Sequence, residues 1–168
     1  MEEEGIWSFR PIRPEDDAAI ASIIRSVMPA FGASGPGFAI HDAEVNAMCE
    51  AYERPGCAYF VVEFNGHVLG GGGIAPLLGG DANTCELRKM YFLPELRGKG
   101  LGKKLLRHCL LKARELGYTK CYLETLSGMD AAMHLYEQAG FRQIANSKGC
   151  TGHHGCDRYY EMDLETVQ

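Results

Sequence analysis

The chain has 168 residues, of which 46% are hydrophobic and 23% charged, the composition of an ordinary globular domain. This length predicts one domain, residues 1–168, with a substantial core. The formal net charge of −5 argues against a nucleic-acid partner, because such domains usually carry a basic excess. No stretch approaches the roughly 20 apolar residues of a membrane span, so we expect no membrane partner.

The N-terminus and the cysteines bear on the compartment. The chain begins M-E-E-E-G, which is acidic where a signal peptide is basic. Seven cysteines without regular paired spacing are unlike a disulfide framework. We therefore expect a reduced, cytoplasmic protein, either a monomer or a homodimer.

The first third of the chain predicts an edge strand and two helices. The segment S-F-R-P-I-R-P-E-D-D is typical of an edge strand that leads into a helix start, and the first helix continues to Val27. A Gly/Pro-rich loop, 28–38, carries two phenylalanines, of which Phe31 is a candidate substrate contact. This loop either covers a binding site or plugs the core. A second helix is expected at 41–52.

The middle of the chain predicts a hairpin and a strand. Strands at 57–64 and 68–74 flank Asn65-Gly66, a strong hairpin signal. The run Gly70–Gly73 indicates either a close approach by a backbone or ligand, or a bulged strand end. The next strand is expected at 85–93.

The last part alternates helices and strands. An amphipathic helix is expected at 100–116, with Gly117 as its C-cap, and a second at 129–139. Further strands are expected at 120–125, at 141–145 and from about 158 to 164. The strand–helix–strand order implies local parallel pairing, whereas the hairpins are antiparallel. The fold class is therefore α/β (α+β), a mixed sheet of about six to seven strands with helices on both faces.

The segment R-G-K-G-L-G, residues 97–102, lies between a strand and an amphipathic helix. It fits neither the Walker A spacing nor the dinucleotide fingerprint. Glycines let the backbone approach a phosphate closely, and the helix N-terminus attracts an anion. The segment therefore predicts a site for a phosphate-bearing ligand.

R-x-x-G-x-G at 97–102 resembles the acetyl-coenzyme A loop of the GNAT (GCN-related N-acetyltransferase) superfamily. The segment L-Y-E-Q-A-G-F, residues 135–141, resembles the family's L-Y-x-x-x-G-F signature. The I-R-P opening, the hairpin and the element order extend the likeness over essentially the whole chain. The resemblance implies the GNAT fold, in which two parallel strands, here 85–93 and 120–125, splay apart around the pantetheine arm.

The resemblance also implies the residues that contact acetyl-CoA. They are Met90, Tyr91, Phe92, Arg97, Gly98, Lys99, Gly100, Leu101, Gly102 and Lys103. One position departs from the family pattern. Met129 stands where many members have a cofactor-contacting Asn, and Ser127 and Thr125 are the candidates to replace that contact.

Two residues are candidates for proton transfer. Glu86 stands eleven residues before Arg97, where several family members carry a glutamate base. Burial in a cleft would raise its pKa into a useful range, and the alternative is a solvated residue paired with Arg88. Tyr136 matches the tyrosine that serves many members as general acid, and the alternative is a packing tyrosine.

The C-terminal loop suggests the acceptor side. Cys150, His153, His154 and Cys156 crowd one short segment, but structural zinc sites usually pair two well-separated ligand turns, so we expect no metal. His153 or His154 either contacts substrate or lies in a solvated loop. Arg88 would suit an acceptor that bears a carboxylate.

These observations predict an acetyl-CoA-dependent N-acetyltransferase that acts on a primary amine of a small molecule, amino acid or peptide. Direct attack in a ternary complex is preferred, because no cysteine can be paired with a base from the sequence. Two alternatives stay open: a catalytically silent CoA-binding sensor or interaction module, and an acyltransferase that uses a longer acyl-CoA.

Overall fold

The computed structural model describes residues 5–30, 35, 37–96 and 98–167. Seven strands form one mixed sheet in the order β1-β2-β3-β4-β5-β7-β6. The strands are β1 (Trp7–Pro11), β2 (Ala58–Phe64), β3 (His67–Pro76), β4 (Thr84–Phe92), β5 (Lys120–Thr125), β6 (Arg142–Ile144) and β7 (Arg158–Asp163). The α-helices are α1 (Asp17–Ala30), α2 (Met48–Tyr52), α3 (Leu101–Glu115) and α4 (Asp130–Ala139).

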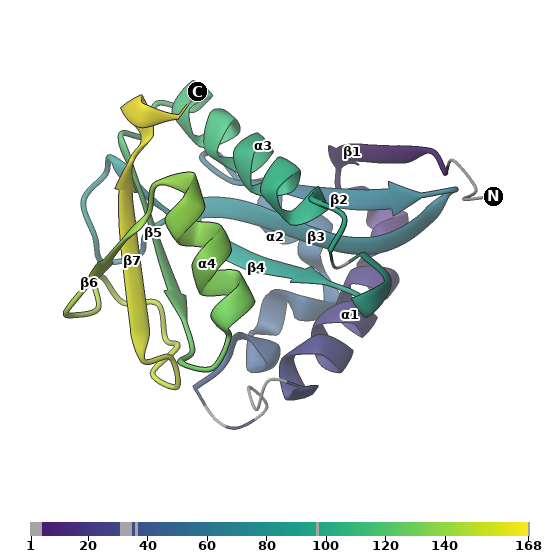
Figure 1. Ribbon diagram of the computed structural model, residues 1–168, viewed down its shortest axis with the longest axis horizontal. Helices are drawn as coiled ribbons and strands as arrows, with labels where there is room; N and C mark the ends of the chain where they lie inside the picture. Colours follow the sequence, from purple (N-terminus) through teal and green to yellow (C-terminus); the bar gives the residue numbers. More distant parts are fainter. Residues whose placement is uncertain (1–4, 31–34, 36, 97, 168) are drawn as a thin grey trace.

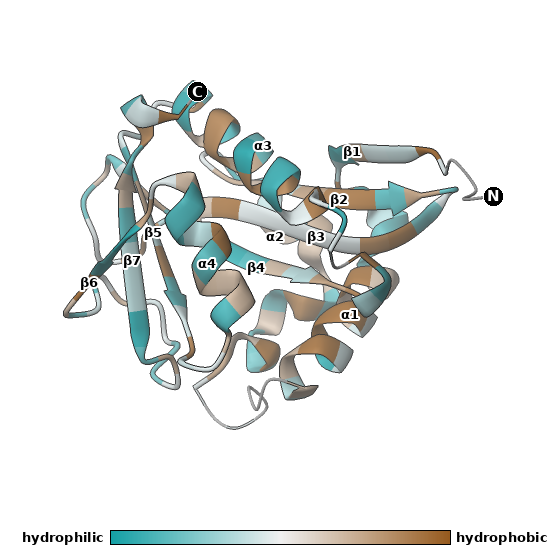
Figure 2. Ribbon diagram, viewed as in Figure 1, coloured by the Kyte–Doolittle hydropathy of each residue, from teal (hydrophilic) through white to brown (hydrophobic). Residues whose placement is uncertain are grey.

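Helices cover both faces of the sheet, as expected (Figure 1). Helices α3 and α4 lie on one face and share a core cluster with residues such as Leu87 and Leu123. Helices α1 and α2 lie on the other face, where Ile24 and Met48 pack against Val61. Figure 2 shows hydrophobic and hydrophilic residues alternating around α3, as its amphipathic sequence requires. In the described part of the chain, no helix has the length and apolar character needed to cross a membrane.

The hairpin signal is confirmed. Strands β2 and β3 pair antiparallel, and the turn residues Asn65 and Gly66 have φ values of 48° and 83°. Two consecutive positive φ values are typical of a type I′ turn, which explains the Asn-Gly pair. Gly117 also has a positive φ, 96°, directly after α3, as expected of a C-cap.

The predicted helix at 41–52 is correct only in its last part, α2, which ends at Tyr52. The structure has short 3-10 turns at Ala39–His41 and Ala43–Asn46, and a single α-helical segment, α2, follows. The backbone of Asp42 is extended, and Ala47 has φ −142° and ψ 51°, so both interrupt the helix. The apolar spacing that suggested a helix survives, because Val45 and Met48 are both buried.

Strand β4 contains one extra residue relative to β3. Gly71 pairs with Tyr91 and Gly73 with Arg88, so the register shifts at Lys89, whose φ is 47°. The Tyr59 hydroxyl donates a hydrogen bond of 2.7 Å to the Lys89 carbonyl and holds this β-bulge. The four glycines lie within β3, and a Cβ on Gly73 would come within 2.4 Å of the Ala58 carbonyl oxygen. The close approach of a backbone is therefore present, whereas the bulge lies opposite the glycines on β4 and not at a strand end.

The bulge reverses the alternation of side chains along β4. Before it, Cys85 and Leu87 face the cluster under α3 and α4. After it, Met90 and Phe92 face that cluster, whereas Tyr91 faces the α1 side. An unbroken strand of period two would place residues 85 and 90 on opposite faces.

The parallel pair β4–β5 separates after a short contact. Three residue pairs connect the strands, from Thr84 with Lys120 to Glu86 with Tyr122, although β4 continues to Phe92 and β5 to Thr125. The splayed pair expected from the sequence is therefore present. Beyond Glu86, the edge of β4 that faces β5 has no strand partner in the described sheet.

Candidate active site

Two cavities meet in the gap between β4 and β5. The first, here the loop cavity, has a volume of about 420 Å³ and runs along Phe92, Gly98, Gly100 and Gly102. The second, here the carboxylate cavity, has a volume of about 90 Å³ and contains Glu86. Their linings share five residues: Met90, Tyr91, Met129, Ala132 and Tyr136.

The loop cavity ends at the N-terminus of α3. Gly98 and Gly100 have φ values of 79° and 73°, and a Cβ at either position would meet no atom within 4 Å. The cavity wall here is open backbone, and the N-terminus of the 15-residue helix α3 and the ammonium of Lys103 follow it. These groups together suit a phosphate-bearing ligand.

Most of the expected cofactor residues line this cavity. They are Met90, Tyr91, Phe92, Gly98, Gly100, Leu101, Gly102 and Lys103. Lys99 is not among the lining residues, and its Nζ instead lies 5.6 Å from the centroid of the Trp7 ring. Arg97 lies outside the described residues.

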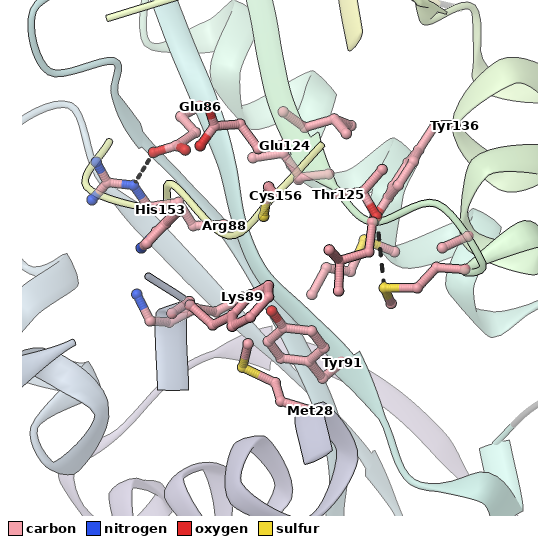
Figure 3. A pocket seen from close by; sticks show the side chains of 18 residues that line it. Met28, Glu86, Arg88, Lys89, Tyr91, Glu124, Thr125, Tyr136, His153 and Cys156 are labelled. Carbon is pink, nitrogen blue, oxygen red and sulfur yellow. Dashed lines mark hydrogen bonds and ion pairs between the residues drawn. The ribbon is translucent and has the colours of Figure 1, made fainter. Parts of the chain in front are cut away.

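Glu86 lies in the carboxylate cavity and is 2% exposed. Arg88, two residues along the strand, donates from Nε to Glu86 Oε1 at 2.6 Å (Figure 3). Burial raises the pKa of Glu86 above its usual value, and the neighbouring Arg88 partly opposes this shift. Glu86 is thus paired with Arg88, as one interpretation held, but it is buried beside a cavity and not solvated.

Tyr136, on α4, lies where the two cavities meet. Its ring packs edge-on against Phe141 with centroids 5.9 Å apart, so the residue has a packing contact as well as a place in the cavity wall. Burial raises its pKa to about 12, which keeps the phenol protonated near neutral pH. Within the described part of the chain, its hydroxyl has no hydrogen-bond partner and is available to a ligand.

The two candidate histidines have different surroundings. His153 lines the carboxylate cavity, and its Nε2 lies 2.9 Å from Oδ2 of Asp42. That carboxylate raises the pKa of His153. His154 is exposed and lies against Gly37 instead of lining the cavity. Of the two loop phenylalanines, Phe38 lines the cavity, and Phe31 lies outside the described residues.

Sequence reasoning missed a buried charge network. Lys89 is 4% exposed, and its Nζ pairs with Asp42 at 2.7 Å and with Glu44. Asp42 therefore contacts both Lys89 and His153, although 111 positions separate it from His153. A lysine inside a strand was the available signal, but its partners are distant in sequence.

Glu124, on β5, was also missed. It lines the carboxylate cavity, and its carboxylate accepts hydrogen bonds from Tyr122, at 2.7 Å, and from Thr151. Glu124 follows the apolar residues Cys121–Leu123 near the carboxyl end of β5, which is a usable signal because ligands bind at that end of parallel strands.

The remaining candidates near the cavities are now placed. Thr125 donates to the Met129 sulfur at 3.7 Å and lines the carboxylate cavity. Ser127 bonds Asp157 through both its backbone N–H and its hydroxyl. Cys156 lines the carboxylate cavity, and burial raises its thiol pKa to about 12, so it stays protonated and is a poor nucleophile.

This arrangement, a mixed sheet opened between two parallel strands with a glycine loop at one end, defines a GNAT-type domain. The model of the acetyltransferase (GNAT) family matches residues 20–141, and the chain belongs to this family. The Escherichia coli K12 protein named uncharacterized N-acetyltransferase YjgM is 46% identical over 150 residues, 89% of this chain and 90% of that protein.

Solved structures share the fold. A GNAT-family acetyltransferase from Staphylococcus aureus superposes with a TM-score of 0.81 at 21% identity, over 95% of this chain and 99% of that one. YncA from Salmonella typhimurium, solved with its cofactor acetyl-CoA, gives a TM-score of 0.73 at 25% identity, over 95% and 94% of the chains.

Proposed function

We propose that this protein transfers an acetyl group from acetyl-CoA to a primary amine by direct attack in a ternary complex. One observation carries the proposal. A glycine-lined cavity at a helix N-terminus meets, at Tyr136, a second cavity that contains the buried carboxylate of Glu86. The first suits a phosphate-bearing donor, and the second suits an amine that must lose a proton.

The loop cavity would hold the donor. Backbone N–H groups of residues 98–102 and the N-terminus of α3 bind the pyrophosphate, with Lys103 beside them. The pantetheine arm lies in the splay, along the edge of β4 that β5 leaves unpaired. The N–H groups of that edge can hydrogen-bond the acetyl carbonyl as negative charge develops on its oxygen.

The carboxylate cavity would hold the acceptor. A primary amine is mostly protonated near neutral pH, so Glu86 removes a proton before attack. The nitrogen then bonds to the carbonyl carbon while the carbon–sulfur bond breaks. Tyr136 donates a proton to the leaving thiolate, and the nitrogen loses its second proton as the amide forms. An ammonium and acetyl-CoA thus give an N-acetyl product, free CoA thiol and one proton.

The test follows thiol release from acetyl-CoA across a panel of amines: monoamines, diamines, amino acids and short peptides. We expect amine-dependent release with at least one class. Acetyl-CoA binding without any amine-dependent release would favour the sensor or interaction module. The presence of Glu86 in the carboxylate cavity and of Tyr136 where the two cavities meet supports turnover.

The acyl group is tested separately. Met90 and Met129 line both cavities and so flank the passage that a longer acyl chain would enter. We expect acetyl-CoA to outcompete propionyl- and succinyl-CoA when the three are supplied together. A preference for a longer acyl-CoA would support the second alternative.

A further inference from the structure

The carboxylate cavity contains two carboxylates that lie side by side. Glu86 projects from β4 and Glu124 from β5, and Figure 3 shows their carboxylates close together in the cavity. One ligand atom from each, and one ring nitrogen of His153, all lie within 4.8 Å of one another. Three acceptor-capable groups therefore converge on one point.

Only one of the two carboxylate oxygens of Glu86 contacts its cationic partner, Arg88, among the described residues. Its Oε1 accepts from Arg88, and within the part of the chain that the structure describes, Oε2 has no hydrogen-bond donor. The Glu86 side chain is almost fully buried, with an exposed fraction of 2%. Among the described residues no fully buried side-chain oxygen lacks a partner, so this oxygen is open to the cavity, where a ligand N–H or water can donate to it.

The neighbouring charges are already paired. Arg88 neutralises Glu86, and Lys89 lies between Asp42 and Glu44. His153 is paired with Asp42. These pairs leave little net charge of their own.

Glu124 is different. Its hydrogen-bond donors are the hydroxyls of Tyr122 and Thr151, which carry no charge. Among the described residues, no cation forms an ion pair with it. The cavity therefore holds one carboxylate charge that the protein positions but does not neutralise.

We propose that Glu124 binds the acceptor amine as its ammonium ion, with the free oxygen of Glu86 on the same nitrogen. The inference rests on the proposed function and names its acceptor subsite: a primary ammonium, without a carboxylate directed at Glu124. The ammonium has three N–H donors, of which Glu124 takes one and Glu86 another. Glu86 then removes the proton it contacts, and Glu124 retains the nitrogen near the thioester.

The two carboxylates have separate tasks because their surroundings differ. Glu86 is buried beside Arg88, and its pKa is raised, which suits proton removal. Glu124 is only half-buried and is held in place by two hydroxyl donors, which suits the binding of an ammonium group. Glu124 is thus a specificity-determining residue for the acceptor.

The test compares Glu124→Gln with Glu161→Gln. Glu161 lies on β7, pairs with Tyr122 in the sheet register and lines neither cavity, so the control removes the same charge nearby. A charge-assisted hydrogen bond predicts that Glu124→Gln raises the amine KM about ten- to a hundredfold. Acetyl-CoA affinity should match that of Glu161→Gln, and each variant's unfolding temperature is compared with that of the native chain, because Glu161→Gln also loses ion pairs with Lys120 and Lys148.

A binding measurement separates this proposal from the proposed function. n-Butylamine is titrated into enzyme saturated with CoA and followed by ligand-observed NMR, which requires no turnover. We expect binding to the native chain and to Glu161→Gln, and a loss of about tenfold or more with Glu124→Gln. If no amine in the panel is acetylated but n-butylamine binding still depends on Glu124, the proposed transferase activity is refuted and the ammonium site is retained.

Three results would overturn the proposal. The first is an unchanged amine KM in Glu124→Gln while native acetylation proceeds. The second is n-butylamine binding that ignores the substitution. The third is a stoichiometric divalent metal in the purified protein, removed by EDTA and absent from Glu124→Gln, because the three converging groups would then be a metal site.

Discussion

Replacement of Glu86 by Gln removes the proposed base and keeps nearly the same shape. The side chain is 2% exposed, and burial raises its pKa above the usual 4.5 of a glutamate. Above that raised pKa, the native carboxylate accepts a proton from a bound ammonium. Native kcat/KM should therefore lie on a plateau in the neutral range and fall as the pH drops through the raised pKa, where the carboxyl becomes protonated.

The size of the effect follows from the amine. A primary amine with a pKa near 10 is roughly one part in a thousand neutral at pH 7. General-base catalysis contributes roughly 10²–10⁴-fold, so Glu86→Gln should lose at least about a hundredfold in kcat/KM at pH 7. The variant depends on amine that is already neutral, so its rate should rise about tenfold per pH unit until the amine pKa is reached.

The assay is thiol release from acetyl-CoA, measured from pH 5 to 10 with the best amine from the panel. Acetyl-CoA affinity is measured alongside, because Glu86 does not line the loop cavity and its replacement should leave that affinity intact. A variant profile parallel to the native profile would refute the reasoning and place the base elsewhere in the cavity.

Three further predictions concern the loop, the proposed acid and the fold. Gly102→Glu should abolish acetyl-CoA binding by calorimetry, whereas Gly102→Ala should retain it, because a Cβ there would lie 3.4 Å from Leu135; equal affinities would contradict the loop assignment. Tyr136→Phe should lower kcat by about tenfold or more with little change in acetyl-CoA affinity, and an unchanged kcat would leave Tyr136 a packing residue. Asp16→Asn should lower the free energy of unfolding by about 1–3 kcal/mol in a denaturant titration at pH 7, because it breaks the ion pair with Arg10 at 2.7 Å while Arg10 keeps its second partner, Glu63. Arg10 lowers the pKa of Asp16 below 3.8, so the difference between native and variant proteins should be full above pH 3.8 and vanish as the pH falls through the lowered pKa; a constant difference would refute the pairing.

Much of the fold could be predicted because local patterns determine it. The apolar spacing of α3 and the Asn65-Gly66 turn are signals carried within a few residues, and both elements appear where expected. The helix prediction for 41–52 was mostly wrong because the structure of that segment depends on contacts distant in sequence. Its apolar spacing is helical, but Asp42 takes an extended backbone and contacts Lys89 and His153, which no local pattern reveals.

The two cavities of the candidate site differ in the same way, because one is formed by neighbouring residues and the other by distant ones. Lining residues of the loop cavity are contiguous in sequence, so a motif could find them, as with Gly98 and Gly100. The carboxylate cavity is assembled from β4, β5 and the loop near His153. The position of Glu124 near the end of β5 is a sequence signal, but its proximity to Glu86 depends on how the strands pair.

The β-bulge at Lys89 has a consequence for how this protein could change over time. Residues before the bulge, such as Glu86, belong to the carboxylate cavity, and Phe92 after it belongs to the loop cavity. One strand therefore carries two sets of contacts that can vary separately. Substitutions at Glu124 or near His153 could retune the acceptor while the donor contacts persist. Lys89 itself is the inserted residue, and it lies between the part of β4 that carries Glu86 and the part that carries Phe92.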